Sequence, residues 1–311
     1  MPSAGGTTTG RVGRRIRRIG VVACVAVCLV VALAGPAAAA PTYPVSYDIA
    51  RAVVTGFFRP DVPPPGANNP RCRSTTHPTP VVLVHGTGVN QNSSWQAIAP
   101  ELANRGYCVY TTTVGYLYGA RNVGELDSVT TSATQLAAFV QKVRGWTGAE
   151  KVDLVGHSQG GTVNLFYLRY DKGYEYVRRV VGLAPANNPP TFYIDLVDLI
   201  PGLRALLPKV IPATGQLLSP AAFQALVPRT YPGVEYSNIV SRYDELAVPP
   251  TVAFLPAGPN VRNILVQDIC PAEHVGHLGM IADPNVTRML MNELDLENAT
   301  PVKCGPSGIP F

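Results

Sequence analysis

The sequence predicts an α/β fold in which a mostly parallel sheet carries helices on both faces. Short β-branched runs alternate with helical segments from residue 80 to residue 296. The run PVVLV at 80–84 is too apolar for a strand with one solvent-exposed face, which indicates a central strand that is buried on both faces. Repeated alternation of this kind is typical of a parallel sheet with crossover helices.

The first forty residues are predicted to be a secretory signal peptide and not part of the fold. A cationic start at 11–18 (RVGRRIRR) precedes an almost purely apolar run at 19–34, and small residues follow. The apolar run is short for a membrane span. We expect cleavage near Ala40, so that the mature protein begins at about Pro41, is secreted and keeps no stable membrane span. The alternative is a single N-terminal anchor helix.

The basic balance of the chain belongs to this segment. The full sequence has 25 basic and 20 acidic residues. The excess consists of the five arginines of the signal segment: Arg11, Arg14, Arg15, Arg17 and Arg18. A near-neutral mature protein argues against a nucleic-acid partner. Residues 41–311 are ordinary in number for one α/β domain, which we expect to be a monomer.

Cysteine usage agrees with export. Four cysteines remain after residue 40: Cys72, Cys108, Cys270 and Cys304. An even number in an exported protein suggests two disulfides, and four cysteines allow three pairings. We favour Cys72–Cys108, which ties the N-terminal segment to an early strand, and Cys270–Cys304, which fixes the C-terminal tail.

The individual elements follow from composition and periodicity. Residues 59–80 are rich in proline without periodicity, which predicts a loop. In chain order, the pattern then predicts a strand at 80–84, a helix at 93–106, a strand at 107–114, an amphipathic helix at 132–146, a strand at 151–155, a helix at 160–170 and a strand at 177–184. The later part predicts strands within 235–244 and 263–269 and a helix at 285–296.

One segment breaks this alternation. Residues 187–232 are rich in leucine and proline and contain no convincing strand. We interpret the segment as an insertion of short helices that lies over the sheet as a cap.

A serine stands at the junction of a strand and a helix. The sequence GHSQGG at 156–161 follows the apolar strand at 151–155 and precedes apolar residues at helical spacing. In such a tight turn, side chains at Gly156 and Gly160 would collide with neighbouring backbone. The Ser158 hydroxyl would point out above the sheet, near the positive end of the next helix. The pattern G-x-S-x-G in this context indicates a nucleophilic serine.

A nucleophilic serine needs a base to take its proton, and the sequence has five histidines. His77 lies in the proline-rich loop, His85 belongs to a glycine-rich motif, and the side chain of His157 should project away from the adjoining serine. His274 and His277 follow the last predicted strand, where this chain order places the base. We favour His277, because its flanking glycines suit an exposed loop, and keep His274 as the alternative.

The acid of such a site is expected between the serine and the histidine, at the C-terminal end of a strand. Asp244 comes just after the run 237–241, and prolines close the turn that follows. Its carboxylate would hold the imidazole in the required tautomer and stabilise the imidazolium. Glu245 is the alternative.

An oxyanion needs hydrogen-bond donors. The strand at 81–84 ends in His85-Gly86-Thr87-Gly88, a turn whose backbone N–H groups can face the serine. We expect one donor to be the N–H of Gln159, directly after the serine, and the second to come from Thr87, whose hydroxyl could add a further bond.

Four motifs, VVLVHGTG, GHSQGG, YDELAVP and VGHLG, together resemble the secreted bacterial triacylglycerol lipases of the class 2 type. The Gly-Thr-Gly and Ser-Gln-Gly-Gly motifs and the spacing of the later cysteines are also similar to the fungal lipase B type. The resemblance implies an α/β-hydrolase fold with Ser158, Asp244 and His277 as catalytic triad, and Thr87 and Gln159 as oxyanion donors. The insertion is longer than in minimal lipases of this type.

The resemblance also implies a function. We expect a secreted serine hydrolase that cleaves acylglycerol or related carboxylic esters through an acyl-enzyme, at a lipid–water interface and without a metal or organic cofactor. An esterase for soluble esters or polyesters, of the cutinase-like kind, would have an identical triad. An acyltransferase that excludes water from the acyl-enzyme is a further alternative. A binding module on an inactive fold would require a lost triad member, and none is missing.

Overall fold

The computed structural model describes residue 6 and residues 42–305 and contains a six-stranded sheet. The order is β2-β1-β3-β4-β5-β6, and every neighbouring pair is parallel. The strands are β1 Val81–Val84, β2 Val109–Thr111, β3 Val152–His157, β4 Val177–Leu183, β5 Glu235–Val240 and β6 Val261–Leu265. The predicted signal peptide at 1–40 lies outside the described residues, apart from residue 6.

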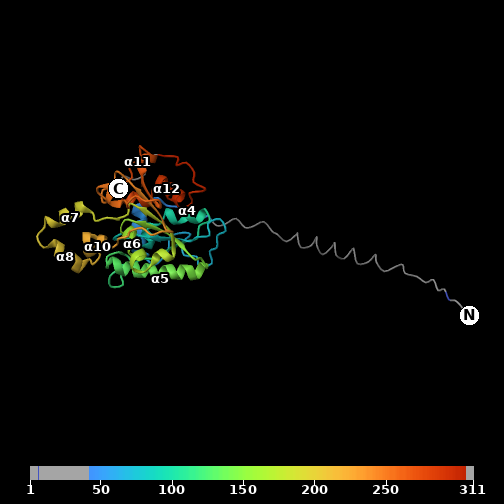
Figure 1. The fold of residues 1–311 in the computed structure, drawn as a ribbon, viewed down its shortest axis with the longest axis horizontal. Coiled ribbons are helices and arrows are strands. Elements are labelled where there is room, and N and C mark those ends of the chain that lie inside the picture. Colours follow the sequence, from blue (N-terminus) through green and yellow to red (C-terminus); the bar gives the residue numbers. More distant parts are fainter. Residues whose placement is uncertain (1–5, 7–41, 306–311) are drawn as a thin grey trace, which may run out of the picture. The chain divides into compact units, whose positions relative to one another are not determined.

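Helices cover both faces of this sheet (Figure 1). Helices α5 (Val129–Thr147) and α6 (Gln159–Tyr170) lie on one face, and α4 (Ile98–Asn104) and α12 (Pro284–Leu294) lie on the other. Successive residues of a strand point to opposite faces. The wholly apolar β1 therefore supplies side chains to two separate cores.

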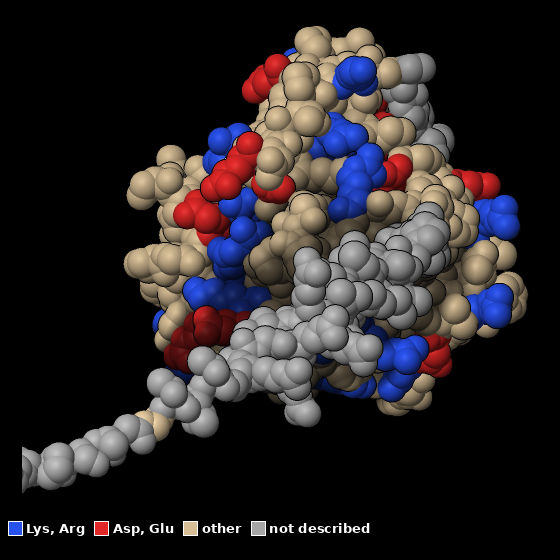
Figure 2. All heavy atoms as spheres, turned by 90° about the vertical axis from the view of Figure 1, so that its right-hand side faces the viewer, with Lys and Arg blue, Asp and Glu red and all other residues tan. Residues whose placement is uncertain are grey.

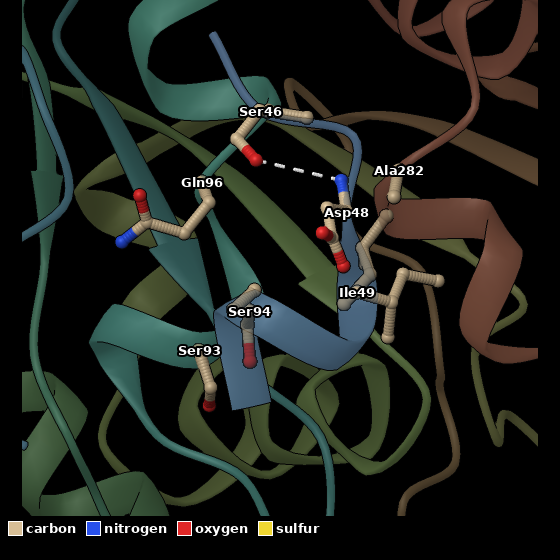
Figure 3. Close-up of a pocket in the computed structure, with 10 residues that line it drawn as sticks. Ser46, Asp48, Ile49, Ser93, Ser94, Gln96 and Ala282 are labelled. Carbon is tan, nitrogen blue, oxygen red and sulfur yellow. Dashed lines mark hydrogen bonds between the residues drawn. The ribbon is translucent and has the colours of Figure 1, made fainter. Parts of the chain in front are cut away.

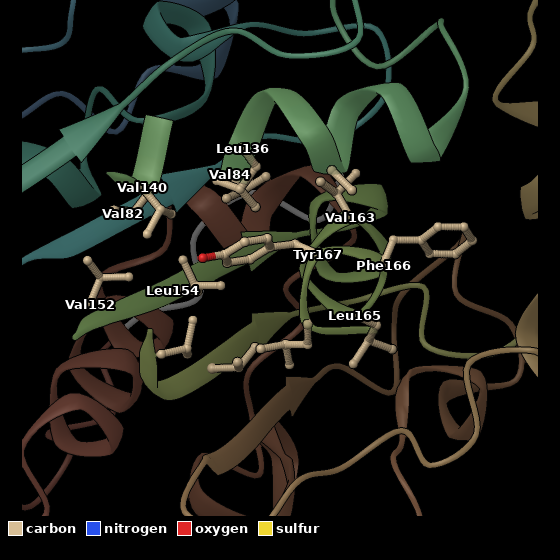
Figure 4. Close-up of a cluster of buried hydrophobic side chains, with 14 of the residues drawn as sticks. Val82, Val84, Leu136, Val140, Val152, Leu154, Val163, Leu165, Phe166 and Tyr167 are labelled. Carbon is tan, nitrogen blue, oxygen red and sulfur yellow. The ribbon is translucent and has the colours of Figure 1, made fainter. Parts of the chain in front are cut away.

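The core on the α5–α6 side fixes helix α6 against the sheet. Figure 4 shows Val82, Val84, Leu154, Val163 and Tyr167 gathered between the strands and these helices. All five side chains are buried. Burial of a side chain of this size contributes about 1.5–3 kcal/mol. The start of α6, which carries the residues after the predicted nucleophile, is thus held firmly relative to β1 and β3.

A helix that the sequence pattern did not predict, α2 (Ile49–Phe58), precedes the sheet. The Asp48 carboxylate caps this helix by accepting the N–H of Arg51 at 2.9 Å, and Ser46 Oγ accepts the N–H of Asp48 (Figure 3). The hollow drawn in Figure 3 has a volume of about 10 Å³, which is room for about one water molecule. This hollow is therefore too small to hold a substrate.

The prediction of one continuous helix at 93–106 is wrong. The structure has two helices there, α3 (Gln91–Ser94) and α4. A continuous helix would place Pro100 in its interior, where the missing N–H and the ring clash would disrupt it. Because α4 begins at Ile98, Pro100 lies in the first turn, where proline is tolerated.

Two predicted strands are shorter than expected. The strand predicted at 107–114 is reduced to β2, and the one at 263–269 ends at Leu265. Leu265 pairs with Val240, the last residue of β5, so the chain beyond it has no strand to pair with. The chain instead turns into the short helix α11 (Val266–Ile269).

The segment 187–232 consists of short helices, as its composition predicted. The four helices are α7 Thr191–Asp198, α8 Leu203–Val210, α9 Thr214–Leu217 and α10 Pro220–Gln224. Helices α7 and α8 lie at the left end of the view in Figure 1. Helix α9 is tied to the start of α5, because Gln216 accepts the N–H of Val129 at 2.6 Å and donates to Thr130 Oγ1 at 2.7 Å.

The surface carries charges of both signs. On the face drawn in Figure 2, lysine and arginine side chains are interspersed with aspartate and glutamate. This distribution agrees with the near-equal numbers of acidic and basic residues after residue 40. Within residues 42–305, no helix has the length and apolar character needed to cross a membrane.

Both favoured disulfides are present in the structure. Cys72 bonds to Cys108, directly before β2, and Cys270 bonds to Cys304 in the C-terminal tail. The bonded residues are 36 and 34 positions apart in the sequence. Each bond therefore restricts a sizeable loop of the unfolded chain.

We expect the mature protein to have no free thiol, and each disulfide to stabilise it by about 2–4 kcal/mol. Thiol titration of denatured, unreduced protein tests the first point. Urea unfolding of a Cys72→Ser/Cys108→Ser variant and of a Cys270→Ser/Cys304→Ser variant tests the second. One titratable thiol per chain, or an unchanged free energy of unfolding in both variants, would contradict the prediction.

Candidate active site

Ser158 occupies a strained turn between β3 and α6. Its backbone has φ 54° and ψ −125°, a conformation that costs a non-glycine residue about 1–3 kcal/mol. The surrounding backbone holds this turn. The Ser158 N–H donates to Leu183 O at 3.1 Å, and the Ser158 carbonyl accepts the N–H groups of Gly161 and Ala186. The turn directs the hydroxyl into a cavity at the carboxyl edge of the sheet.

Two glycines allow the start of α6 to touch the end of β1. A Cβ atom on Gly160 would lie 2.3 Å from Val84 O and 2.6 Å from His85 O. A Cβ atom on Gly86 would lie 3.0 Å from Ser158 Cβ. A side chain at position 160 would push the two segments apart, so the turn at 85–88 lies beside Ser158 only because that position is glycine.

This contact brings the predicted oxyanion donors to the serine. Gln159 is the first residue of α6, so its N–H has no acceptor within the helix. Thr87 and Gln159 line the same cavity as Ser158. The Thr87 hydroxyl donates to Gln159 Oε1 at 2.5 Å. The hydroxyl that the sequence suggested as an additional oxyanion donor thus joins the two donor segments to each other.

The His85 side chain stabilises the turn at 85–88 through hydrogen bonds at both of its ring nitrogens. Its Nε2 accepts the N–H of Val114 at 3.1 Å, so Nδ1 carries the proton and donates to Gly86 O at 2.9 Å. Burial lowers the pKa of His85 to about 4, which keeps the ring neutral. A second bond, from the Gly88 N–H to Gly124 O at 3.0 Å, fixes the far end of the turn.

Asp244 and His277 form a hydrogen-bonded pair. His277 Nδ1 lies 2.9 Å and 3.0 Å from the two carboxylate oxygens of Asp244. Burial alone would raise the pKa of Asp244, but hydrogen bonds from His277 and from the N–H groups of Ala247 and Leu246 lower it below its usual value. The ionised carboxylate accepts the Nδ1 proton of the imidazole, which leaves Nε2 as the basic atom.

Ser158 and His277 line one cavity of about 370 Å³, a volume in the range of ligand pockets. No hydrogen bond joins the Ser158 hydroxyl to the His277 imidazole within residues 42–305. Such bonds are often long until a substrate binds. Most of the wall is apolar and comes from the insertion and the segments around it: Ala184, Ala186, Pro190, Tyr193, Val197, Leu207, Leu217, Leu218, Leu246, Ala247 and Val252.

Residues 81–297 match the profile of the Alpha/beta hydrolase family. The chain belongs to this family. A 2-hydroxy-6-oxo-2,4-heptadienoate hydrolase of Pseudomonas putida is 29% identical to this hydrolase over 169 residues, which are 53% of this chain and 55% of the relative. A triacylglycerol lipase of Pseudarthrobacter phenanthrenivorans is 37% identical over 92 residues, 28% of this chain and 27% of the relative. The matches thus span about half and about a quarter of these relatives' lengths.

Among solved structures, Aspergillus fumigatus lipase B superposes with a TM-score of 0.53 at 16% identity, covering 72% of this chain and 54% of that one. A likeness at this identity concerns the fold alone. Together with the family match, it confirms the α/β-hydrolase fold that the motifs predicted. The local match to a triacylglycerol lipase likewise confirms the resemblance to lipases.

The two alternative residues of the sequence analysis lie outside the imidazole–carboxylate pair of this hydrolase. His274 has an exposed side chain, and its ring lies against Tyr243 with the centroids 4.4 Å apart. Glu245 contacts His277 through the backbone, because its Oε2 accepts the His277 N–H at 2.9 Å. The geometry therefore favours Asp244 and His277.

His157 is a site residue whose role the sequence analysis missed. Its ring lies beside the ring of His277 with the centroids 4.9 Å apart, and its Nε2 lies 3.0 Å from the backbone carbonyl oxygen of His277. No signal in the sequence could have linked positions 120 residues apart. Among the described residues, no group of three or more His, Cys, Asp or Glu side chains is placed to hold a metal ion.

Two buried histidines predict that the protein loses stability in acid. Burial lowers the pKa of His85 to about 4, and burial together with the nearby His277 lowers that of His157 to about 3. In the unfolded chain both rings take up protons near pH ~6.5. Between this pH and about 4, the unfolded state therefore binds two protons that the native state does not. These two groups lower the free energy of unfolding by roughly 2.7 kcal/mol per unit of falling pH.

Urea unfolding between about pH 5.5 and about pH 4.5 measures this slope, because the unfolded rings are almost fully protonated only about one unit below pH ~6.5. In the variant His85→Gln, the amide oxygen can reach the place of Nε2 and accept the Val114 N–H, and about half of the slope should disappear. Comparing variant and wild type at each pH cancels the contributions of other groups. Equal slopes in the two proteins would show that His85 titrates in the native state as it does in the unfolded chain.

Proposed function

We propose that this protein is a secreted serine hydrolase that cleaves carboxylic esters of lipids. The observation that carries the proposal is the meeting of Ser158 with the Asp244–His277 pair at one apolar cavity. The apolar wall of the cavity suits an acyl chain. The polar residues that line the same cavity, among them Thr87, Ser158 and Gln159, suit an ester carbonyl. The local similarity to proteins named triacylglycerol lipase supports the same substrate class.

In the first half of the proposed reaction, Ser158 Oγ attacks the ester carbonyl carbon while His277 Nε2 takes the hydroxyl proton. The Asp244 carboxylate stabilises the imidazolium that results. The N–H groups of Gln159 and Thr87 donate to the oxyanion of the tetrahedral intermediate. The intermediate then collapses to an acyl-enzyme, and His277 returns the proton to the leaving alcohol.

In the second half, water attacks the acyl-enzyme while His277 again accepts a proton. The carboxylic acid leaves, and the proton returns to Ser158. The apolar wall supplied by the insertion holds the acyl chain during both steps, with Tyr193, Leu207 and Leu217 contributing from three different helices.

Export is part of the proposal. The cationic and apolar segments before residue 35 have the order of a signal peptide. Two disulfides are typical of a protein that folds in an oxidising compartment and are rare in the cytosol. We therefore propose an extracellular location for the mature protein.

Ser158→Ala and His277→Ala should each lower kcat for hydrolysis of p-nitrophenyl esters by at least about a thousandfold, because each removes a member of a unit that acts together. His274→Ala should change kcat by less than about threefold, since the His274 ring lies outside the cavity. Circular dichroism of each variant checks that it is folded. Purified Ser158→Ala with more than about a thousandth of wild-type activity would exclude Ser158 as nucleophile. A large loss at His274 with none at His277 would reassign the base.

The insertion decides between a lipase and an esterase for soluble substrates. Leu199, Leu206 and Val210 are 76%, 54% and 61% exposed. Exposed apolar residues beside the cavity would contact a lipid surface and would add little for a dissolved ester. Leu199→Asp and Leu206→Asp should therefore lower activity on an emulsified long-chain triglyceride by about tenfold or more, and leave activity on a short soluble ester within about twofold.

Leu296→Asp is the matched control, because Leu296 is exposed and lies after α12, outside the insertion. It should leave both activities unchanged. Equal losses on both substrates in the insertion variants, or no loss on either, would indicate that these leucines serve packing alone. The protein would then be assigned to the soluble or polyester esterases.

A further inference from the structure

The backbone of His277 is bound by side chains at both its N–H and its carbonyl group. The N–H donates to Glu245 Oε2 at 2.9 Å, and the carbonyl oxygen accepts from His157 Nε2 at 3.0 Å. His277 stands at the end of the segment 271–277, which contains neither helix nor strand. His277 is followed by the short 3₁₀ helix Leu278–Ile281, to which its carbonyl contributes by accepting the Met280 N–H at 3.4 Å. The two side-chain bonds are shorter than this backbone bond and supply the main support of the residue.

The two supporting residues are sequence neighbours of the other proposed triad members. Glu245 directly follows Asp244, and His157 directly precedes Ser158. The turns that position Ser158 and Asp244 thus also position His157 and Glu245, which hydrogen-bond the backbone of His277. A shift of either turn would be transmitted to His277.

We propose that Glu245 and His157 are positioning residues that fix the backbone of His277 so that its Nε2 stays directed toward Ser158. This inference rests on the proposed function, in which His277 is the general base. Neither residue contacts the substrate or exchanges a proton in the reaction.

His157 is suited to this task as a neutral donor. A carbonyl oxygen only accepts, so His157 Nε2 carries the proton and Nδ1 is unprotonated. The ring is buried, and its Nδ1 has no hydrogen-bond partner within the described chain. An unsatisfied buried polar atom costs about 1–3 kcal/mol, which calls for a role that offsets it. Burial lowers the pKa of His157 to about 3, so the ring adds no positive charge beside the imidazolium of His277.

Glu245 supplies the opposite kind of contact. Its carboxylate oxygen accepts the His277 N–H in a charge-assisted bond, which is stronger than a bond between neutral groups. Its own backbone carbonyl accepts the hydroxyl of Tyr193 at 3.2 Å, so helix α7 of the insertion contacts the same residue. Glu245 is exposed, and truncating its side chain should therefore leave the core intact.

The test compares variants that keep or lose each hydrogen bond. Glu245→Ala should lower kcat for a soluble p-nitrophenyl ester about 10- to 100-fold with KM within about twofold, since misplacing a catalytic group by ~1 Å can cost about a hundredfold. Glu245→Gln keeps an oxygen acceptor and should restore kcat to within about threefold of wild type. At the second position, His157→Phe should lower kcat, and His157→Gln, which keeps an N–H donor, should recover part of the loss.

A structural defect and a positioning defect are told apart by two readouts. The melting temperature of Glu245→Ala should equal that of the control Glu150→Ala, an exposed glutamate outside the site. The downfield proton resonance of the His277 Nδ1–H should broaden in Glu245→Ala and be retained in Glu245→Gln. Because Glu245 is exposed, this pair stays informative even if a His157 variant fails to fold.

The outcomes separate this inference from the proposed function. Inactive Ser158→Ala together with fully active Glu245→Ala would overturn the positioning role alone. Glu245→Gln as impaired as Glu245→Ala would also overturn it, because the acceptor oxygen would then be irrelevant. Active Ser158→Ala would overturn the proposed function itself.

Discussion

The contact between the first turn of α6 and the end of β1 sets the position of every other group in the site. Val84 O and His85 O lie so close to Gly160 that no side chain fits between them. Because the contact is between backbones, it leaves little freedom for either segment. The strained turn at Ser158 and the glycine-rich turn at 85–88 are consequently held against each other. The proposed nucleophile and oxyanion donors are placed by main-chain packing, and side chains such as His85 reinforce that placement.

The parallel sheet extends the same constraint to the proposed acid Asp244 and the proposed base His277. Strands β1, β3 and β5 all end at one edge, and the turns that follow them carry Thr87, Ser158 and Asp244. The carboxyl edge of a parallel sheet gathers residues that are distant in sequence. After β6, the side chain of Gln267 accepts the N–H of Arg242 at 2.8 Å, which ties the helix α11 to the acid turn. His277 lies between an irregular segment and the short 3₁₀ helix Leu278–Ile281, and side chains bind both its N–H and its carbonyl group.

The sequence could predict the features that depend on local pattern. The apolar run of β1 and the glycines around Ser158 have short-range signatures, and the turns that carry Asp244 and His277 each have a local motif of their own. Helix α2 was missed, and the break before α4 was overlooked although Pro100 signals it. The end of β6 could not be predicted, because it depends on where β5 ceases to offer a partner. The contacts of His157 and Glu245 with His277 depend on an irregular loop whose path no periodicity describes.

The insertion combines firm attachment with an outer face that the described chain does not bury. It is attached to α5 through Gln216 of α9 and to the acid turn through Tyr193 of α7, so these two helices are fixed beside the cavity. Between these attachments, no residue of α8 is buried within the described chain. Leucines on the inner side line the cavity, whereas Leu206 and Val210 face outward. An apolar surface of this kind is stable in water only at a cost, which contact with another apolar phase removes. The exposed apolar face therefore supports the proposal that the substrate enters the cavity from a lipid surface and not as a dissolved ester.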